Sequence, residues 1–184
     1  MRLVLPMVTV LLTAASFGTA ALAPVESRSS LVVDYREWTR VNPTPHRVES
    51  RIAAECRVAS KGEHAREKAS PHLDKFVTVY GNPAARKPML ERKRPVFPRG
   101  SLLVKEKLST ADSRAPELLT VMRKREKGYF PAGGDWEYLV LDGSGSKIEE
   151  RGRLKRCASC HAQWKETGFV SRTYLSAAAR HRLR

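Results

Sequence analysis

Acidic residues, cysteine and long apolar runs are all scarce in this sequence. Aspartate and glutamate number 19 against 34 lysines and arginines, so the formal net charge is +15. The one apolar run, near the N-terminus, is too short and too rich in small residues to favour a membrane span. There are no internal repeats. The scarcity of acidic groups directs attention to anionic partners, and the scarcity of cysteine limits the metal and redox sites that the chain could build.

The chain has three cysteines, and two of them form a Cys-x-x-Cys pair at Cys157 and Cys160. A structural zinc site needs four ligands, but Cys56 lies about a hundred residues upstream without a second ligand beside it. A thioredoxin-like dithiol would open the first helix of a βαβ unit, whereas this pair lies near the C-terminus. Cys56 is expected to be a small, buried or half-buried residue. Zinc and dithiol chemistry therefore fit the pair less well than a third use does.

That third use is indicated by His161, which completes the motif Cys157-Ala158-Ser159-Cys160-His161. Cys-x-x-Cys-His is the attachment signature of a c-type haem. Two thiols one helical turn apart can add to the two vinyl groups, and the histidine then presents a ring nitrogen to the iron. The motif predicts one covalent haem c per chain, held by Cys157 and Cys160, with His161 as the metal ligand.

The N-terminus is predicted to be a signal peptide, residues 1–23. Arg2 is followed by an apolar run, and small residues then gather between Ser16 and Ala23, where a signal peptidase could cut after Ala20, Ala21 or Ala23. We therefore expect a periplasmic or otherwise exported protein with no integral membrane span after signal removal. Covalent haem attachment takes place outside the bacterial cytoplasm, so export and the haem motif support each other.

The basic surface has two interpretations. Nucleic acid is not expected as a partner, because the protein is exported and no basic stripe is interleaved with aromatic residues. The densest basic run, residues 86–99, is interrupted by prolines and is typical of a solvated loop. The charge either keeps the protein soluble or attracts an acidic redox partner.

The rest of the chain divides into three parts. Residues 24–74 are expected to hold a short amphipathic helix over Asp34–Val41 and a polar loop region. Residues 75–176 are expected to form a β-rich haem-binding domain, and residues 177–184 a basic, frayed tail. The predicted strands of the domain are 76–80, 101–108, 117–123 and 135–142, with a brief helix at 83–90 and a haem-motif helix at about 153–163. Short connections favour antiparallel pairing. The predicted fold class is α+β: mainly an antiparallel β-sheet with peripheral helices and a C-terminal Cys-x-x-Cys-His helix.

An ordered set of short motifs carries a resemblance to a known family. These motifs are Tyr35-Arg36-Glu37-Trp38, Thr78-Val79-Tyr80 with Asn82-Pro83, Gly100 to Glu106, Gly134-Asp135-Trp136-Glu137, Cys157 to His161, and Thr173-Tyr174-Leu175. In this order, with strands between them, the chain resembles the cytochrome P460 family, which includes the β-sheet cytochromes c′. The resemblance implies a haem-bearing antiparallel sheet, commonly a homodimer, with His161 as proximal ligand. It also implies an open distal side that binds or oxidises a small gaseous or nitrogenous ligand, nitric oxide or hydroxylamine.

In hydroxylamine-oxidising relatives a strand lysine is bonded to the haem ring, and by placement that lysine would be Lys105. Strand alternation puts Lys105 on one face with Leu103 and Lys107. The relatives' distal arginine and acidic residue fall near Val77 and Thr120, which are neutral and favour an apolar, gas-binding pocket. Phe76, Tyr129 and Phe130 are candidates for an aromatic cap.

Two function classes remain open from the sequence. In the first, a five-coordinate iron binds nitric oxide or oxidises hydroxylamine, and the sequence leaves open whether the protein is an enzyme. The alternative is a six-coordinate electron-transfer cytochrome docking on an acidic partner, with His72 or Met122 as the second axial ligand. His46, His64 and His181 lie in polar stretches and are expected to be solvated.

Overall fold

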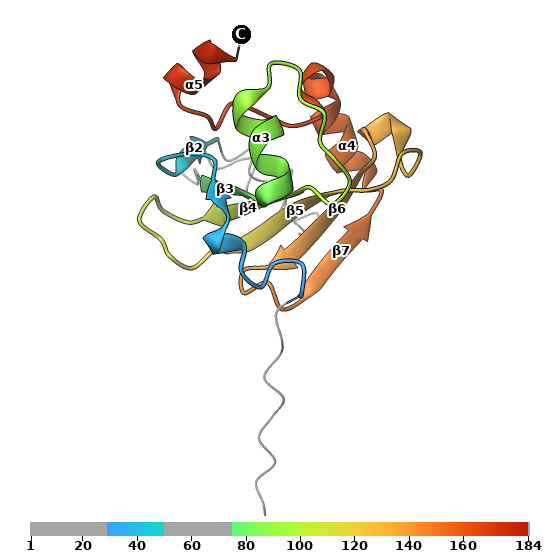
Figure 1. The fold of residues 1–184 in the computed structure, drawn as a ribbon. Coiled ribbons are helices and arrows are strands. Elements are labelled where there is room, and N and C mark those ends of the chain that lie inside the picture. The colour runs from blue at the N-terminus through green and yellow to red at the C-terminus, as the bar shows by residue number, and fades with distance from the viewer. Residues whose placement is uncertain (1–28, 50–74, 184) are drawn as a thin grey trace, which may run out of the picture.

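The computed structural model describes residues 29–49 and 75–183 of the chain, and these form one twisted antiparallel sheet with helices on its surface (Figure 1). The seven strands lie in the order β1-β3-β4-β5-β6-β7, and β2 also pairs with β3. Their bounds are β1 Thr39–Arg40, β2 His46–Val48, β3 Lys75–Gly81, β4 Leu102–Leu108, β5 Leu118–Lys124, β6 Trp136–Asp142 and β7 Ile148–Gly152. Every pairing is antiparallel, which confirms the predicted fold class.

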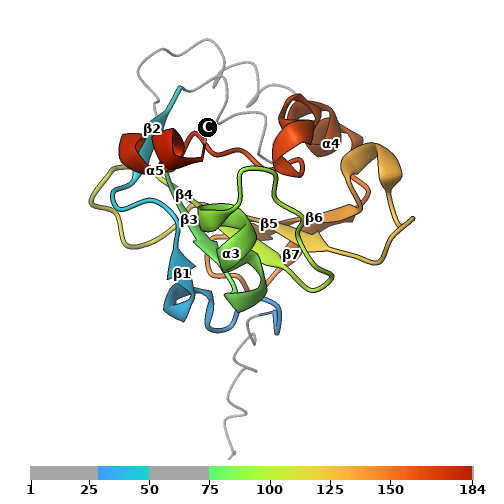
Figure 2. The same cartoon turned by 45° about the horizontal axis from the view of Figure 1, so that its top comes forward.

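Within residues 29–49 and 75–183, three α-helices lie on the same side of the sheet (Figures 1 and 2). They are α3 Pro83–Glu91, α4 Lys155–His161 and α5 Ala177–Arg182, and three 3-10 turns, η1 Tyr35–Glu37, η2 Pro131–Gly133 and η3 Ala162–Thr167, complete the fold. The Asn82 side chain accepts from the Ala85 amide at 3.1 Å, so α3 starts where an N-cap followed by proline predicts a start. No helix in the two described ranges is long and apolar enough to cross a membrane.

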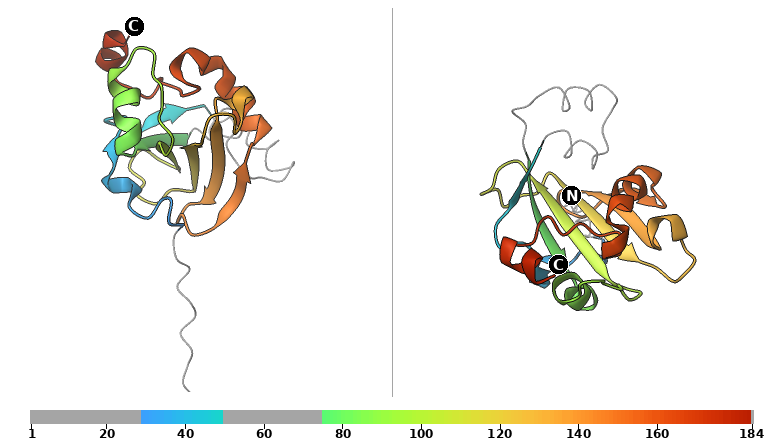
Figure 3. Two further views of the ribbon diagram at one scale, coloured as in Figure 1. Left: turned by 45° about the vertical axis from the view of Figure 1, so that its right-hand side comes forward. Right: turned by 90° about the horizontal axis from the view of Figure 1, so that it is seen from above.

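Alternation along the strands divides the core into two layers, one on each face of the sheet. The helix-covered face carries a cluster that includes Val79, Leu103 and Tyr138, packed against α3 and α4. The other face carries Val104, Leu119 and Leu139 with further apolar residues, covered by the N-terminal segment around η1. Figure 3 shows the helices standing off one face of the curved sheet.

The expected helix over Asp34–Val41 is wrong. The chain makes only the 3-10 turn η1, adopts an extended backbone at Trp38 (φ −73°, ψ 173°), and continues into β1. Thr39 and Arg40 then pair with Gly81 and Tyr80 of β3. Pairing with a strand outweighs the helical spacing of the aromatic residues in so short a segment.

Two further expectations are corrected at the C-terminal end of the chain. Residues 148–152 form the edge strand β7, which was not predicted, and the tail expected to be frayed forms α5 from Ala177 to Arg182. Ser176 caps α5 by accepting from the Ala179 amide at 3.2 Å. The predicted signal peptide, Cys56, His64 and His72 lie outside the described residues.

Candidate functional site

The haem motif lies on the short helix α4 and its C-terminal end. α4 starts after Leu154, whose extended backbone (φ −66°, ψ 104°) leads in from β7, and it ends at His161. Residues three apart on a helix share a face, so Cys157 and Cys160 are neighbours on the surface of α4. Ala158 is buried in the core cluster on the helix-covered face of the sheet, and this contact holds α4 against that face. The helix therefore presents two thiols and a histidine from a rigid support.

His161 is held in one tautomer. Its Nδ1 lies 2.7 Å from the carbonyl oxygen of Phe169, and a carbonyl only accepts, so Nδ1 carries the proton. Nε2 is left as the nitrogen that a metal would bind, and the hydrogen bond to the Phe169 carbonyl orients the ring. Burial lowers the pKa of His161 to about 4, and the charge of Lys105 adds to the lowering. The imidazole is therefore neutral at neutral pH, which is the form that ligates iron.

The residue that provides this carbonyl has an unusual backbone. Phe169 has a φ of +65°, in the left-handed region that non-glycine residues rarely adopt. Gly168 before it has a φ of +70° and accepts from the Trp136 Nε1 at 2.9 Å. Strain of this kind gathers at functional sites, where the surrounding structure maintains it. Here it turns the chain so that the Phe169 carbonyl faces His161.

Between α4 and the sheet lies a pocket with an empty volume of about 770 Å³, counting the space open to solvent. Its walls are largely aliphatic, and they include Cys157, Cys160 and His161 from α4. Other lining residues come from four strands, from α3 and from the segment after η3: Val79, Met89, Leu103, Lys105, Thr120, Met122, Tyr138, Val140, Val170, Ser171 and Tyr174.

Lys105 lies on the floor of this pocket. In the sheet it pairs with Val79 on one side and Thr120 on the other, and Thr120 pairs with Val140. All four residues line the pocket. The strand alternation read from the sequence is therefore correct for Lys105, which lines one cavity with the Cys-x-x-Cys-His motif.

Tyr138 is a pocket residue that sequence reasoning did not single out. It is 3% exposed, and its ring lies 5.5 Å from that of His161. Its hydroxyl is one of three buried side-chain polar atoms without a hydrogen-bond partner in the described part of the chain. Burial raises the pKa of Tyr138, and the neighbouring thiols of Cys157 and Cys160 raise it further, so the group stays protonated. A buried hydroxyl without a partner at a pocket wall indicates that the pocket receives a group with an acceptor atom.

A carboxylate also reaches this side of the sheet, from the unpredicted strand β7. Glu150 pairs with Val140, which continues the row of Lys105 and Thr120 toward the sheet edge. Arg156, one residue before the first thiol, holds Glu150 through two bonds of 2.5 and 2.7 Å and itself lines the pocket. The sequence signal that could have found this pair is the placement of Glu150 on a short strand directly before the haem-motif helix.

The other residues proposed for the distal side are distributed unevenly. Thr120 lines the pocket, whereas Val77 lies one row farther along the same face, opposite Lys107. The aromatic cap is wrong for Phe76, which alternates onto the opposite face of the sheet. Neither Tyr129 nor Phe130 lines the pocket. Tyr129 stacks under arginines at 4.5 and 4.7 Å, and Phe130 packs against the core beside η2.

Tyr138 and Tyr174 supply the aromatic side chains of the pocket instead. His46 is half-buried rather than fully solvated, and its ring lies 5.6 Å from that of Tyr174. Met122, considered above as an axial ligand, lies in the pocket next to Tyr138 in the sheet. The pocket face thus gathers residues that are far apart in the sequence.

These features fit a haem. The walls are apolar, two thiols lie one turn apart at the rim, and His161 offers an oriented neutral nitrogen. A search of curated proteins finds no match to the chain. The family model for cytochrome P460 matches residues 33–171, which include every strand of the sheet and the haem motif. A haem cofactor is what this match implies, and by it the chain belongs to the cytochrome P460 family.

Proposed function

We propose that the protein is an exported haem c protein that oxidises hydroxylamine at an open iron site. Cys157 and Cys160 would hold the haem through thioether bonds, and the His161 Nε2 would bind its iron. The observation that carries the proposal is the meeting of Lys105 with the Cys-x-x-Cys-His motif in one pocket. Membership in the family supports the haem, and the apolar N-terminal run supports export.

When bound, the haem supplies the redox-active iron that accepts electrons from the ligand. The chain supplies the rest. The Phe169 carbonyl fixes the His161 ring, and the aliphatic walls exclude water and bulky or charged ligands. Hydroxylamine loses protons as it loses electrons, so a base near the site is needed. Our candidate for that base is Glu150, which does not line the pocket itself but lies in the strand row of Lys105 and Thr120 and is bonded to Arg156, which does line it.

Lys105 is proposed as the cross-linking residue. Its Nζ would form a C–N bond to a ring carbon, with the loss of two protons and two electrons. An oxidant must accept these electrons, and hydrogen peroxide does so by forming two waters. Lys105 has strand neighbours on both sides in the sheet, so its backbone is held in place at the pocket that it lines.

The test of the cross-link is the optical spectrum of the purified ferrous protein after secretion from a host that matures c-type haems. We expect a strongly red-shifted Soret band that Lys105→Arg abolishes while intact mass still shows one haem per chain. Lys107→Arg is the matched control, because Lys107 occupies the same strand face two residues on, and it should keep the shifted band. The same spectrum for Lys105→Arg and the unaltered protein would exclude the cross-link.

Proton transfer is tested by Glu150→Gln. We expect it to slow the hydroxylamine-dependent reduction of an added one-electron dye by about 10²–10⁴-fold, the usual contribution of a general base. Glu149→Gln is the control, since Glu149 is the neighbouring carboxylate and pairs with Lys147 at 3.0 Å. Equal rates in the two variants would remove Glu150 from the mechanism.

The apolar walls favour a second candidate, which is nitric oxide binding without oxidation. An ordinary high-spin ferrous spectrum that changes on addition of nitric oxide, with no hydroxylamine-dependent dye reduction, would select it. A low-spin spectrum that responds to neither ligand would overturn both candidates. If Met122→Leu then converted that spectrum to high spin, the six-coordinate electron carrier would be the better description.

A further inference from the structure

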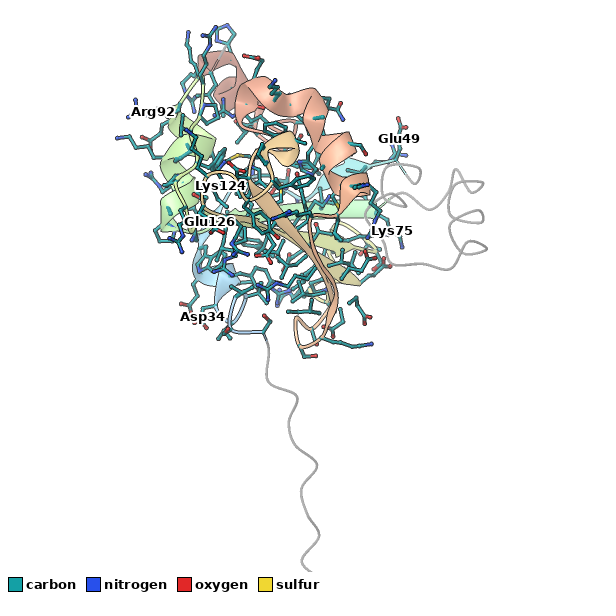
Figure 4. The ribbon with its side chains drawn as sticks, turned by 90° about the vertical axis from the view of Figure 1, so that its right-hand side faces the viewer. Asp34, Glu49, Lys75, Arg92, Lys124 and Glu126 are labelled. Atoms are coloured by element: carbon teal, nitrogen blue, oxygen red, sulfur yellow. The ribbon has the colours of Figure 1, made fainter. Side chains whose placement is uncertain are left out.

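The loop between α3 and β4 carries a compact basic surface with an apolar centre. Arg92, Lys93, Arg94 and Arg99 are all exposed, and Val96 between them is 84% exposed. We call these five residues the loop patch. Figure 1 shows the loop arching between α3 and α4, and Figure 4 shows Arg92 projecting away from the body of the protein. Carboxylates offset the charge of the patch only in part: Glu126 forms a long ion pair with Arg99 at 3.9 Å, whereas Glu91 pairs with Arg86, outside the patch, at 2.9 Å.

Hydrogen bonds from Arg172 and the packing of Phe97 hold the backbone of this loop in place. The guanidinium group of Arg172 donates to the carbonyl oxygens of Pro88, Arg92 and Lys93, at 2.7, 2.5 and 3.2 Å. Phe97 is buried, and its ring meets that of Trp136 at 5.3 Å. The exposed side chains therefore stand on a fixed backbone, which lowers the entropy lost when a partner docks.

The same contacts connect the loop patch to the haem ligand. Trp136 donates to the carbonyl oxygen of Gly168, and the next residue, Phe169, accepts the bond from His161. Phe97 lies next to Val96 in the chain and in van der Waals range of Gly168. A continuous set of packed rings and hydrogen bonds thus leads from His161 through Gly168 and Phe97 to the centre of the loop patch.

The composition of the loop patch favours a protein partner over a membrane. Helices and loops that enter a lipid surface insert large apolar residues such as Trp, Phe or Leu. The exposed large apolar residues in the described part of the chain are two valines and one isoleucine, with no aromatic residue among them. One small apolar contact inside a basic ring fits a weak, transient interface, in which charge steers the encounter and the buried area stays small.

We propose that the loop patch is the docking surface for an acidic protein that takes one electron at a time from the haem. The inference rests on the proposed function, because hydroxylamine oxidation requires a place for the electrons to go. In each transfer the iron goes from the ferrous to the ferric state and the partner's one-electron centre is reduced. No atom or proton is exchanged between the two proteins.

The test uses the full-length haem-loaded protein, reduced with dithionite and mixed by stopped flow with cytochrome c. Succinylated cytochrome c, whose lysines carry added carboxylates, is the acidic probe, and unmodified cytochrome c is the basic one. Lys93→Glu/Arg94→Glu reverses two charges of the loop patch. Arg40→Glu/Arg114→Glu is the matched control, because both arginines border the polar groove on the opposite face of the sheet.

We expect the patch variant to slow electron transfer to the acidic probe at least tenfold at low salt and the control to change it less than twofold. Val96→Ser should slow transfer without changing its salt dependence, because it removes only the apolar contact. Equal slowing by the two charge variants would overturn the docking site. So would a patch variant that loses binding to phosphatidylglycerol vesicles but keeps its electron-transfer rate, since the surface would then serve a membrane.

Failure of this inference is distinguishable from failure of the proposed function. Dithionite reduces the iron without hydroxylamine, so the stopped-flow experiment reports on docking even if the protein only binds nitric oxide. Conversely, a protein that oxidises hydroxylamine with a small dye as acceptor and shows no preference for the acidic probe would retain its function and lose the loop patch as its partner site.

Discussion

Two buried carboxylates on one face of the sheet and a buried tyrosine on the other differ in whether their polar atoms find hydrogen-bond partners. On the face that η1 covers, Glu106 is 4% exposed and accepts from the Tyr35 hydroxyl at 2.6 Å and from Arg36 Nε at 2.8 Å. Glu137 on the same face is 3% exposed and is bonded by Arg125 and Arg151 at 3.0 and 2.7 Å. Each buried carboxylate therefore finds its partners within the chain.

The pocket face carries Tyr138, which is equally buried but has no hydrogen-bond partner for its hydroxyl in the described residues. His161 on this face uses one ring nitrogen internally and leaves the other for a ligand. The difference separates stability from function. Polar groups that satisfy one another stabilise the fold, whereas polar groups left open toward a cavity are satisfied by what enters it.

The largest effect should come from the thiols of the pocket face. Cys157→Ser/Cys160→Ser removes both thioether bonds, so we expect complete loss of covalent haem, measured as intact mass under denaturing conditions. Cys56→Ser is the matched control and should keep the haem mass, because it lies outside the motif. Glu106→Gln on the opposite face should also keep it. Haem retained covalently by the double variant would contradict the assignment of the motif.

The next largest effect should be a loss of stability when a buried carboxylate on the opposite face is removed. Glu106→Ala leaves the buried Tyr35 hydroxyl and the Arg36 guanidinium without their acceptor, so the free energy of unfolding should fall by about 3 kcal/mol in urea titrations. Glu117→Ala is the control: it breaks an ion pair with Lys75 at 2.7 Å in which Glu117 is 38% exposed. An exposed pair contributes at most about 1 kcal/mol. Similar losses in the two variants would show that burial does not distinguish them.

Local sequence patterns predicted the parts of the site that depend on local geometry. The Cys-x-x-Cys-His spacing places its groups through one helical turn, and strand alternation placed Lys105 on the same face as Leu103. The same alternation places Phe76 on the opposite face from Val77, and the sequence reasoning did not apply it there. Alternation along a strand establishes which residues share a face of the sheet. It does not say which face the helices cover and which face the N-terminal segment covers.

The parts that could not be predicted depend on pairing between distant segments. β7 contains two glutamates, an arginine and a glycine instead of an apolar run, and it becomes a strand because β6 offers an open edge. Glu150 lies beside Val140 only through that pairing. Likewise, the helical spacing near Trp38 gave way to pairing of β1 with β3. Tyr138 was read as an ordinary strand residue, since its missing hydrogen-bond partner becomes visible only in three dimensions.

Acid should weaken the face opposite the pocket through Glu137. Burial alone would raise the pKa of Glu137, but the hydrogen bonds from Arg151 and Arg125 outweigh it and hold the pKa below its usual 4.5. A carboxylate with a lowered folded-state pKa stabilises the protein above pH 4.5, and that stability is lost as the pH falls through the folded value. Glu137→Gln should cost about 1–3 kcal/mol at pH 7 and progressively less below pH 4. The check is the urea midpoint between pH 7 and 3, with Glu149→Gln as an exposed control. A constant cost across that range would contradict the linkage.

The smallest effect is the sharpest test of the comparison, because it removes one oxygen atom from each face. Tyr35→Phe deletes a hydroxyl that donates to Glu106, so it should lower the free energy of unfolding by about 1.5 kcal/mol whether or not haem is attached. Tyr138→Phe deletes a hydroxyl without a partner, so in the Cys157→Ser/Cys160→Ser background it should change stability by less than about 0.5 kcal/mol. In the haem-loaded protein the same substitution should alter the pocket instead, seen as a shift in the C–O stretching frequency of the carbon monoxide adduct. Tyr35→Phe should leave that frequency unchanged. If Tyr138→Phe cost as much stability as Tyr35→Phe without haem and left the stretch unmoved with it, the Tyr138 hydroxyl would serve the fold, and the division of roles between the two faces would not hold.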